Sequence, residues 1–350
     1  MLDVRHPARD TDRDPDRGDL QRVTITDVAL AAGVSVATVS KVINSRYGVA
    51  AATSERVQQV IDDLGYESSL VARSLRSHRT NVIGILVAEF EPFSTEILKG
   101  TSRAIAGTGY ELLAYSGGGR PGTDAGWERR YLSRLSGTLI DGAILVTPTV
   151  VETGSQVPVV AIDPHAGPAH MPTVDSDNLQ GAVLATEHLL ALGHRRIGFL
   201  SGREDLESSR LREAGYRQAL ARAGVPVDES LVRVGDYRQE TATGPARDLL
   251  ALTHRPTAVF AANDLSAIDT MQAAAELGLS VPDDVSVVGF DNVPESALTT
   301  PPLTTVSQPM QRMGSEAVTL LIQLLSGSEP ARTHVRLPVE LVVRGSTGPV

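Results

Sequence analysis

Residues 81–345 alternate short apolar runs with amphipathic stretches, and this alternation most restricts the folds open to the chain. The apolar runs predict strands at Val82–Val87, Glu111–Tyr115, Gly142–Val146, Val159–Ile162, Ile197–Leu200, Ala258–Ala261 and Val285–Phe290. The stretches between them predict amphipathic helices at Thr95–Gly107, Asn178–Leu192, Arg210–Ala223 and Asp264–Leu277. Strands that alternate with helices indicate parallel sheets built from βαβ units.

The strand and helix series begins twice. The segment Asn81-Val-Ile-Gly-Ile-Leu returns as Arg196-Ile-Gly-Phe-Leu, and each copy opens a similar series. Two series predict two stacked α/β subdomains with a cleft between them, and ligands of such sheets lie outside the carboxyl ends of the strands. Duplicated halves that close on a small molecule form a hinge device.

Residues 21–80 predict helices only. Thr26 is expected to cap a helix from Asp27 to Ala32, Gly33 supplies a turn, and Ser35 caps a second helix that reaches Ile43. A third helix follows over residues 53–64 and ends at a glycine. This order is typical of a helix-turn-helix, whose second helix enters the major groove of DNA. A plain helical hairpin is the alternative, and the basic surroundings favour the DNA-binding reading.

Charge is distributed unevenly along the chain. Residues 1–20 carry a net charge of −2, residues 21–80 of +2 and residues 81–350 of −10. An acidic protein with one mildly basic segment fits a single local anionic partner. The first twenty residues alternate acidic and basic side chains without an apolar core, so we expect a disordered tail and not a signal peptide. We therefore expect a cytoplasmic protein.

Composition also excludes several kinds of site. The chain has no cysteine, which excludes disulfides, thiolate metal sites and cysteine nucleophiles. Its eight histidines are scattered, so we expect neither a metal site nor a cofactor. The longest apolar stretch, Val82–Ala88, is too short to span a bilayer. The glycine-rich segment 117–122 lacks the Lys-Ser/Thr ending of a phosphate-binding loop, and no nucleophile elbow occurs, so an enzyme is not expected.

Over residues 21–345 the sequence resembles the lactose/galactose repressor (LacI/GalR) family of bacterial transcriptional regulators. The matching motifs are Val-Ser-Val-Ala-Thr-Val-Ser-Lys-Val-Ile-Asn44, Gly65-Tyr66, Ala72-Arg-Ser-Leu75, Gly-His194-Arg-Arg-Ile-Gly, Ala-Asn263-Asp264, Val-Ser-Val-Val-Gly-Phe-Asp291-Asn and Pro301-Pro-Leu-Thr-Thr-Val. The resemblance implies a small all-α helix-turn-helix domain followed by an α/β periplasmic-binding-protein-like domain of two doubly wound parallel-sheet subdomains.

The resemblance also implies domain boundaries. The helix-turn-helix domain is expected over residues 21–66, a hinge helix or linker over 67–80, and an effector-binding and dimerisation domain over 81–345. Within the last, the N-subdomain is expected over about 81–175 and 310–332. The C-subdomain is expected over about 176–306 and 333–345.

The DNA contacts follow by the same resemblance. Val36, Ala37 and Lys41 are expected to face base edges, and Lys41 stands where the family commonly has Arg, so base discrimination there is expected to be weaker. Contacts with phosphate or support of the helix are expected from a further set of polar residues: Thr26, Ser35, Thr38, Ser40 and Asn44.

Residues 69–76 match the family's hinge helix, which enters the minor groove. Ala72 and Leu75 are expected to touch DNA there, with Leu75 as an apolar wedge between base steps. The chain has Ser68-Ser69 where the family usually has Pro-Asn, and a serine can still cap a helix start. An ordinary buried helix residue is the alternative interpretation of Leu75.

For the effector, the family pattern implies a convergent set of side chains near the carboxyl ends of strands: Phe93, Asp163, Arg212, Tyr237, Asn263 and Asp291. Carboxylates, an amide, a guanidinium and aromatic rings suit a polyol. Each of these residues also has a purely structural alternative, as a cap, a turn, an ion pair or ordinary packing. Asp264 is expected to cap the helix that it begins.

The resemblance therefore implies a homodimeric repressor of carbohydrate-utilisation genes. It would bind a pseudo-palindromic operator in double-stranded DNA, and a small sugar effector would control that binding. A regulator that responds to a nucleobase or nucleoside is the alternative within this class. A sugar-binding transport module shares the two-lobed fold, but residues 1–80 argue against it.

Overall fold

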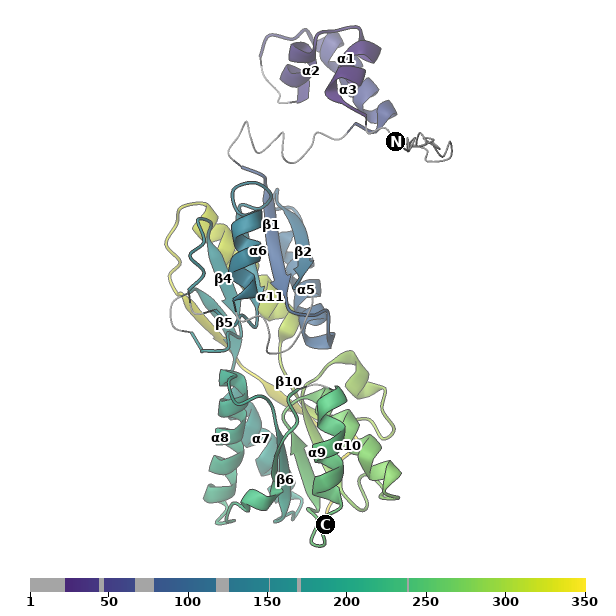
Figure 1. Cartoon of the computed structure of the whole chain (residues 1–350), viewed down its shortest axis with the longest axis vertical. Helices are drawn as coiled ribbons and strands as arrows, with labels where there is room; N and C mark the ends of the chain where they lie inside the picture. Colours follow the sequence, from purple (N-terminus) through teal and green to yellow (C-terminus); the bar gives the residue numbers. More distant parts are fainter. Residues whose placement is uncertain are drawn as a thin grey trace, which may run out of the picture. The chain divides into compact units, whose positions relative to one another are not determined.

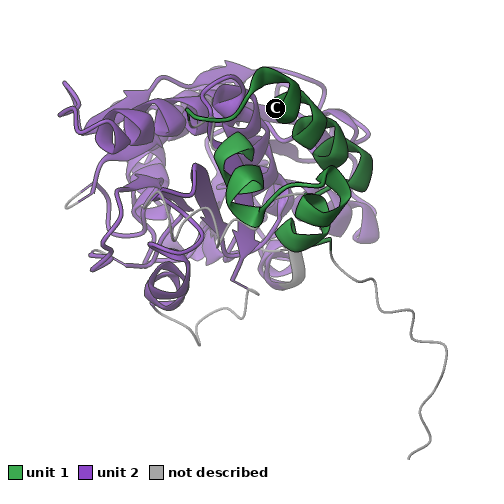
Figure 2. Cartoon of the chain, turned by 90° about the horizontal axis from the view of Figure 1, so that it is seen from above, with its two compact units in different colours: residues 1–73 green, residues 74–350 purple. Residues whose placement is uncertain are grey.

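The computed structural model describes residues 23–43, 47–66, 79–117, 126–150, 152–168, 171–237 and 239–350. The chain divides into two compact units, residues 1–73 and 74–350 (Figure 2). The expected tail over residues 1–20 and all but two residues of the expected hinge segment lie outside the described residues.

The first unit is a bundle of the three short helices α1 (Ile25–Ala32), α2 (Val36–Ile43) and α3 (Ala51–Leu64). Gly33 connects α1 to α2 with a φ of 64°, a conformation that favours glycine. Small and β-branched side chains fill the space between the helices, and the buried ones are Val28, Ala29, Ala32, Val39 and Val57. The helix-turn-helix that the sequence predicts is confirmed.

One detail of α1 differs from the prediction. The helix begins at Ile25, and its N-cap is Thr24 instead of Thr26. Thr24 and Asp27 form a reciprocal capping box, in which the Thr24 backbone N–H donates to the Asp27 carboxylate over 2.8 Å. Thr26 therefore lies exposed inside the first turn. The prediction for α2 is confirmed, since the Thr38 N–H donates to the Ser35 hydroxyl over 3.1 Å.

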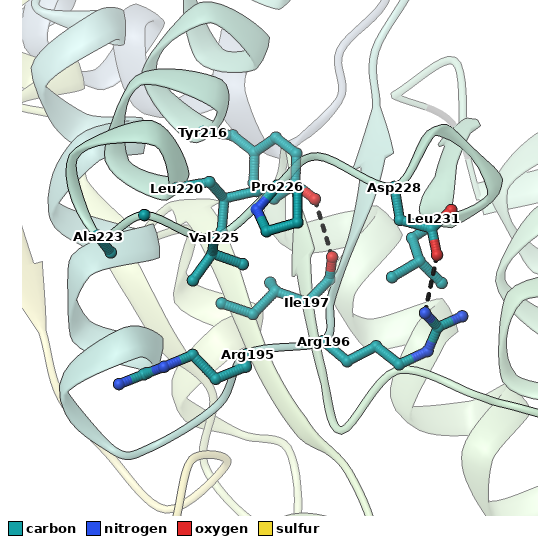
Figure 3. A pocket seen from close by; sticks show the side chains of 11 residues that line it. Arg195, Arg196, Ile197, Tyr216, Leu220, Ala223, Val225, Pro226, Asp228 and Leu231 are labelled. Atoms are coloured by element: carbon teal, nitrogen blue, oxygen red, sulfur yellow. Dashed lines mark hydrogen bonds and ion pairs between the residues drawn. The ribbon is translucent and has the colours of Figure 1, made fainter.

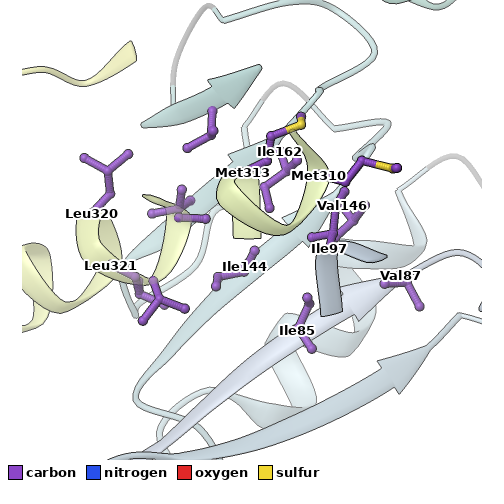
Figure 4. Close-up of a cluster of buried hydrophobic side chains, with 14 of the residues drawn as sticks. Ile85, Val87, Ile97, Ile144, Val146, Ile162, Met310, Met313, Leu320 and Leu321 are labelled. Atoms are coloured by element: carbon purple, nitrogen blue, oxygen red, sulfur yellow. The ribbon is translucent and has the colours of Figure 1, made fainter. Parts of the chain in front are cut away.

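The first sheet of the second unit contains six parallel strands in the order β11-β5-β4-β3-β1-β2. These are β1 (Val82–Val87), β2 (Glu111–Ser116), β3 (Gly142–Val146), β4 (Val159–Ile162), β5 (Thr173–Ser176) and β11 (His334–Leu337). Its helices are α5 (Pro92–Ile105), α6 (Trp127–Leu135) and α11 (Met310–Leu325). Side chains of α11, among them Met313 and Leu321, pack with Ile85 and Ile144 of the central strands in one core cluster (Figure 4).

The second sheet also has six strands, in the order β12-β10-β9-β8-β6-β7, and only β12 is antiparallel to its neighbour. They are β6 (Ile197–Ser201), β7 (Val232–Val234), β8 (Ala258–Ala261), β9 (Ser286–Asp291), β10 (Thr304–Ser307) and β12 (Glu340–Val342). Helices α7 (Asn178–Ala191) and α8 (Glu207–Arg222) contribute to one core cluster, and α9 (Gln239–Leu250) and α10 (Asp264–Glu276) to another. Alternate residues of the central strands enter the two clusters, so both faces of the sheet are covered.

The chain passes between the two sheets three times (Figure 1). The passages are β5 to α7, β10 to α11, and β11 to β12. They are tied together, because the Asp177 N–H donates to the Leu337 carbonyl over 3.0 Å and the Ser176 hydroxyl donates to the Gln308 amide oxygen. Since β5 and β10 both end at these passages, the carboxyl ends of the two parallel sheets face each other.

The expected C-subdomain boundary needs a correction here. His334–Leu337 were expected in that subdomain, but β11 pairs with β5 and extends the first sheet. Only the residues from β12 onward return to the second sheet.

No single helix among the described residues is long and apolar enough to cross a membrane. The helices α1 and α2, which meet at a bend of 104°, would together be long and apolar enough by length and composition alone.

Candidate DNA-reading surface and effector cleft

The candidate DNA-reading surface is the outer face of α2. Val36, Ala37 and Lys41 are exposed there, at 41% for Val36, while Val39 on the opposite face is fully buried. Thr38 and Ser40 are half-buried beside that face, and Ser35 is exposed at the N-cap. The expected base-reading residues therefore share one accessible face. Asn44, Ala72 and Leu75 lie outside the described residues.

Arg212 on α8 is the centre of the expected effector site, and it is only 3% exposed. Its Nε donates to the Asn178 side-chain oxygen over 2.8 Å, and its Nη1 donates to the Ala262 carbonyl. Its guanidinium carbon lies 3.8 Å from the centroid of the Phe290 ring. A cation that is buried, stacked and hydrogen-bonded in this way has a fixed orientation, which a binding site requires.

Asp291 ends β9 and lies 3.5 Å from the Arg212 Nη1. The Gln308 side-chain N–H donates to the same Asp291 oxygen over 2.6 Å. Asp291 itself has a φ of 113°. Burial raises the pKa of Asp291 to about 7, and the Arg212 charge counteracts part of that rise. Gln308 in turn accepts from Ser176, so the site is joined to the passages between the sheets.

Asp163 follows β4 in the first sheet, with a φ of 49°. Burial raises its pKa to about 6, and the charge of Arg212 opposes the rise. The Asn178 side-chain N–H donates to it over 3.5 Å. Asn178 therefore bridges Asp163 of the first subdomain and Arg212 of the second.

Tyr237 lies against the same group of side chains. The Arg212 guanidinium carbon is 5.4 Å from its ring centroid, and its hydroxyl is buried without a hydrogen-bond partner of good geometry among the described residues. Burial raises its pKa, while the neighbouring Ser208 hydroxyl has a smaller, opposite effect. Gly202 makes room for the ring, because a Cβ there would lie 2.2 Å from a ring carbon. A buried phenol without a partner is a group that a ligand can satisfy.

Asn263, and not Asp264 as the sequence suggests, caps α10. Asn263 is the N-cap of α10, because its side-chain oxygen accepts from the Ser266 N–H over 3.0 Å, and its side-chain N–H donates to the Tyr237 carbonyl. Asp264 does not cap this helix. It is fully buried and accepts from the Val293 N–H over 2.9 Å. Asn263 therefore holds the backbone of Tyr237 in place, and both ends of its amide are already occupied.

Phe93 lies in the first turn of α5, half-buried, and packs against the core of the first subdomain. Four polar residues around the cleft were missed by sequence reasoning: Glu91, Asn178, Ser208 and Gln308. Their common signal is position, since each stands within four residues of the end of a strand or the start of a helix.

A separate hollow of about 490 Å³ lies in the second subdomain at the amino end of β6 (Figure 3). Its lining is mainly apolar, and it includes Ile197, Leu220 and Val225. Arg196 on its rim is paired with Asp228 over 2.7 Å. The hollow is at the opposite end of the strands from Asp291, so it is distinct from the effector cleft.

Comparisons with known proteins agree with this geometry. The family profile "Bacterial regulatory proteins, lacI family" matches residues 24–69, and the profile "Periplasmic binding protein-like domain" matches residues 186–347. The transcriptional repressor PurR of Photobacterium profundum is 36% identical over 334 residues, which are 92% of this chain and 98% of the relative. The regulator DegA of Bacillus subtilis is 36% identical over 339 residues, covering 94% and 99%.

Solved structures extend the likeness to both units. The Lac repressor dimer bound to operator and the anti-inducer ONPF matches with a TM-score of 0.81 and 30% identity, over 94% of this chain and all of that chain. The regulator CelR in complex with cellobiose matches with a TM-score of 0.68 and 33% identity, over 93% and 100%. The chain therefore belongs to the lacI family of bacterial regulatory proteins and is a DNA-binding transcriptional regulator, not an enzyme.

Proposed function

We propose that this regulator is a homodimeric, cytoplasmic repressor of carbohydrate-utilisation genes whose hold on a pseudo-palindromic operator is controlled by a small sugar. The observation that carries the proposal is the group of buried polar side chains at the facing carboxyl ends of the two sheets. Arg212 stacks on Phe290 and lies beside Asp291, and the buried Tyr237 hydroxyl lies beside Ser208. Such a set of donors, acceptors and aromatic rings suits a ring that carries several hydroxyls.

In this proposal, Asp163 and Asp291 accept hydrogen bonds from sugar hydroxyls, Arg212 and Tyr237 donate to them, and Asn263 positions Tyr237. Phe93 contributes from the first turn of α5. A ligand that contacts both Asp163 and Asp291 touches both subdomains, so it favours one relative orientation of them. The effector changes DNA binding only by its different affinity for the two orientations.

The DNA-binding half of the proposal assigns base reading to Val36, Ala37 and Lys41 on the exposed face of α2. Thr38, Ser40 and Asn44 would contact phosphates or support the helix, and Ala72 and Leu75 would enter the minor groove. The Lac repressor dimer bound to operator supports this arrangement, because its structure matches 94% of this chain. In vitro selection from randomised duplexes with the full chain tests it. A two-fold symmetric site is expected, and enrichment of an asymmetric site would contradict the dimer.

The effector is tested by thermal unfolding of the purified protein in the presence of single compounds. The panel contains monosaccharides, disaccharides, pentoses, sugar phosphates and nucleobases. A ligand at a hundredfold its Kd adds about 2.7 kcal/mol to the free energy of unfolding, which is readily measured. Stabilisation by a sugar, lost in Arg212→Ala, supports the proposal, whereas stabilisation by a nucleobase alone would replace the sugar with the alternative effector class.

A further inference from the structure

Asp264, the first residue of α10, is a buried carboxylate to which the proposed effector site assigns no role. It is fully buried, and it accepts from the Val293 N–H over 2.9 Å and from the Thr305 hydroxyl. It also lies directly on the backbone of β9, because a Cβ at Gly289 would be 2.3 Å from the Asp264 Oδ1. One buried side chain therefore joins β9, β10 and the residues that follow β9.

The backbone of residues 291–293, which Asp264 fastens, has an unusual conformation. Asp291 and Asn292 have φ values of 113° and 61°, in the region that favours glycine. Residues in such conformations persist only where the surrounding structure fixes them. Here Asp264 holds the Val293 N–H, and the Val293 carbonyl accepts from the Ser296 N–H over 3.0 Å. The conformation of the 291–293 segment thus depends on a contact from α10.

The two ends of the 291–293 segment contact different subdomains. The Asp291 carboxylate lies 3.5 Å from the Arg212 Nη1, within the second subdomain. Val293 is only 2% exposed and belongs to the core cluster of the first subdomain, together with Ile97 of α5. Only Asn292 therefore separates the ligand-facing carboxylate from an apolar contact between the subdomains.

We propose that Asp264 is a positioning residue of the effector site. It fixes the 291–293 segment so that Asp291 faces Arg212 while Val293 lies in the core of the first subdomain, and a ligand bound to Asp291 thereby acts on the contact between the subdomains. The inference rests on the proposed function of this cleft. A binding side chain needs supporting residues that lock its position. Because the segment is fastened at Val293, a shift of Asp291 reaches the apolar contact and is not absorbed by a loose loop.

Four variants of the full chain separate this role from a simple loss of stability. Asp264→Ala removes the acceptor, and Asp264→Asn keeps one side-chain oxygen for the Val293 N–H. Val293→Ala removes the apolar contact and leaves the backbone hydrogen bond. Thr270→Val is the control, because Thr270 is fully buried on the same helix and its hydroxyl donates to the Ser266 carbonyl within α10.

Hydrogen exchange followed by mass spectrometry, without any added sugar, measures the segment itself. In Asp264→Ala, peptides that cover residues 291–298 and α5 are expected to exchange at least about tenfold faster than in the wild type, because opening of the segment removes Val293 from the core. Asp264→Asn is expected to restore most of the protection, and Thr270→Val to leave both peptides at the wild-type rate. Unchanged exchange in Asp264→Ala, or an equal increase in Thr270→Val, overturns the inference.

Calorimetric titration with D-glucose, D-ribose and cellobiose, each added singly, gives the second readout, together with operator binding in the presence and absence of the same sugar. Asp264→Ala is expected to lose about tenfold or more in affinity for the sugar that the wild type binds, as for the loss of one hydrogen bond to a charged group. Val293→Ala is expected to keep that affinity within about threefold, while the change in operator Kd that the sugar causes falls by about fivefold or more. An unchanged operator response in Val293→Ala overturns the link between the subdomains. If the wild type binds none of the three sugars, the proposed effector class fails, and the exchange rates alone decide the role of Asp264.

Discussion

The two functional surfaces of the regulator are built in opposite ways. On α2 the side chains assigned to base reading are exposed, and the core beneath them does not depend on them. In the effector cleft, Arg212 and Asp291 are 3% and 6% exposed and belong to the hydrogen-bond network that holds the second subdomain together. We therefore expect that substitutions on α2 can change specificity for DNA without a loss of stability. Substitutions of Arg212 or Asp291 in the cleft are expected to lower the stability of the fold as well.

The largest effect is expected from Arg212→Ala. The variant removes the cation that lies beside the buried Asp291, which costs about 3–5 kcal/mol in the free energy of unfolding. Chemical denaturation measures this cost, and effector binding should disappear in the same variant. Arg222→Ala is the matched control on the same helix, because Arg222 is exposed and its pair with Glu187 over 3.5 Å contributes at most about 1 kcal/mol. Equal losses in the two variants would break the contrast between buried and exposed charge.

The pH dependence of stability tests the burial of Asp291. Burial raises its pKa from 3.8 to about 7, so between these values the folded protein keeps a proton that the unfolded chain has released. The contribution of Asp291 to stability is therefore complete below pH 3.8 and decreases as the pH rises to about 7. Asp291→Asn lacks this titration. The free energy of unfolding of the variant minus that of the wild type should increase from pH 4 to pH 7 and be constant above. A flat difference would show that Asp291 is ionised throughout.

On the DNA side, Lys41→Ala should leave the free energy of unfolding within about 0.5 kcal/mol of the wild type, because the side chain is exposed. Discrimination between the selected operator and variants at one base pair should fall by about 1–3 kcal/mol. Binding titrations on those duplexes measure it. A uniform loss across all duplexes would instead identify Lys41 as a phosphate contact.

The smallest effect separates the two threonines at the start of α1. Thr24→Ala removes the capping box and should cost about 1 kcal/mol in the stability of the helix-turn-helix. Thr26→Ala changes an exposed position in the first turn and should cost at most about 0.5 kcal/mol in unfolding. Denaturation followed by helix circular dichroism compares the two variants. A larger loss of stability in Thr26→Ala than in Thr24→Ala would identify Thr26 as the cap.

The sequence predicted strongly periodic elements well and polar ones poorly. All seven expected strands occur with ends within one residue, because each is a nearly continuous apolar run. The segments Thr173-Val-Asp-Ser176 and Thr304-Thr-Val-Ser307 escaped prediction, although both are strands with buried hydroxyls. Their hydroxyls and carboxylates find partners far along the chain, such as Thr305 with Asp264. Local pattern does not reveal such partners.

The same limit applies to the cleft. Arg212, Asp291, Asp163 and Tyr237 were predicted and lie in one group of contacts. The predicted cap of α10 was Asp264, but Asn263 caps this helix. Asp264 instead accepts hydrogen bonds from Val293 and Thr305, which the local sequence does not reveal. Gln308 was missed for a similar reason, since its partner Ser176 is 132 residues away in the chain.

The three passages between the sheets have a mechanical consequence. A single flexible connection would let the two subdomains rotate about any axis. Here three connecting segments lie side by side, and hydrogen bonds between Ser176 and Gln308 and between Asp177 and Leu337 join them. This arrangement resists twisting and leaves bending as the easier motion. Gln308 also donates to Asp291, so the joint and the ligand-facing carboxylate share one side chain. A ligand that contacts Asp291 would therefore also act on Gln308, and through it on the bending of the two subdomains.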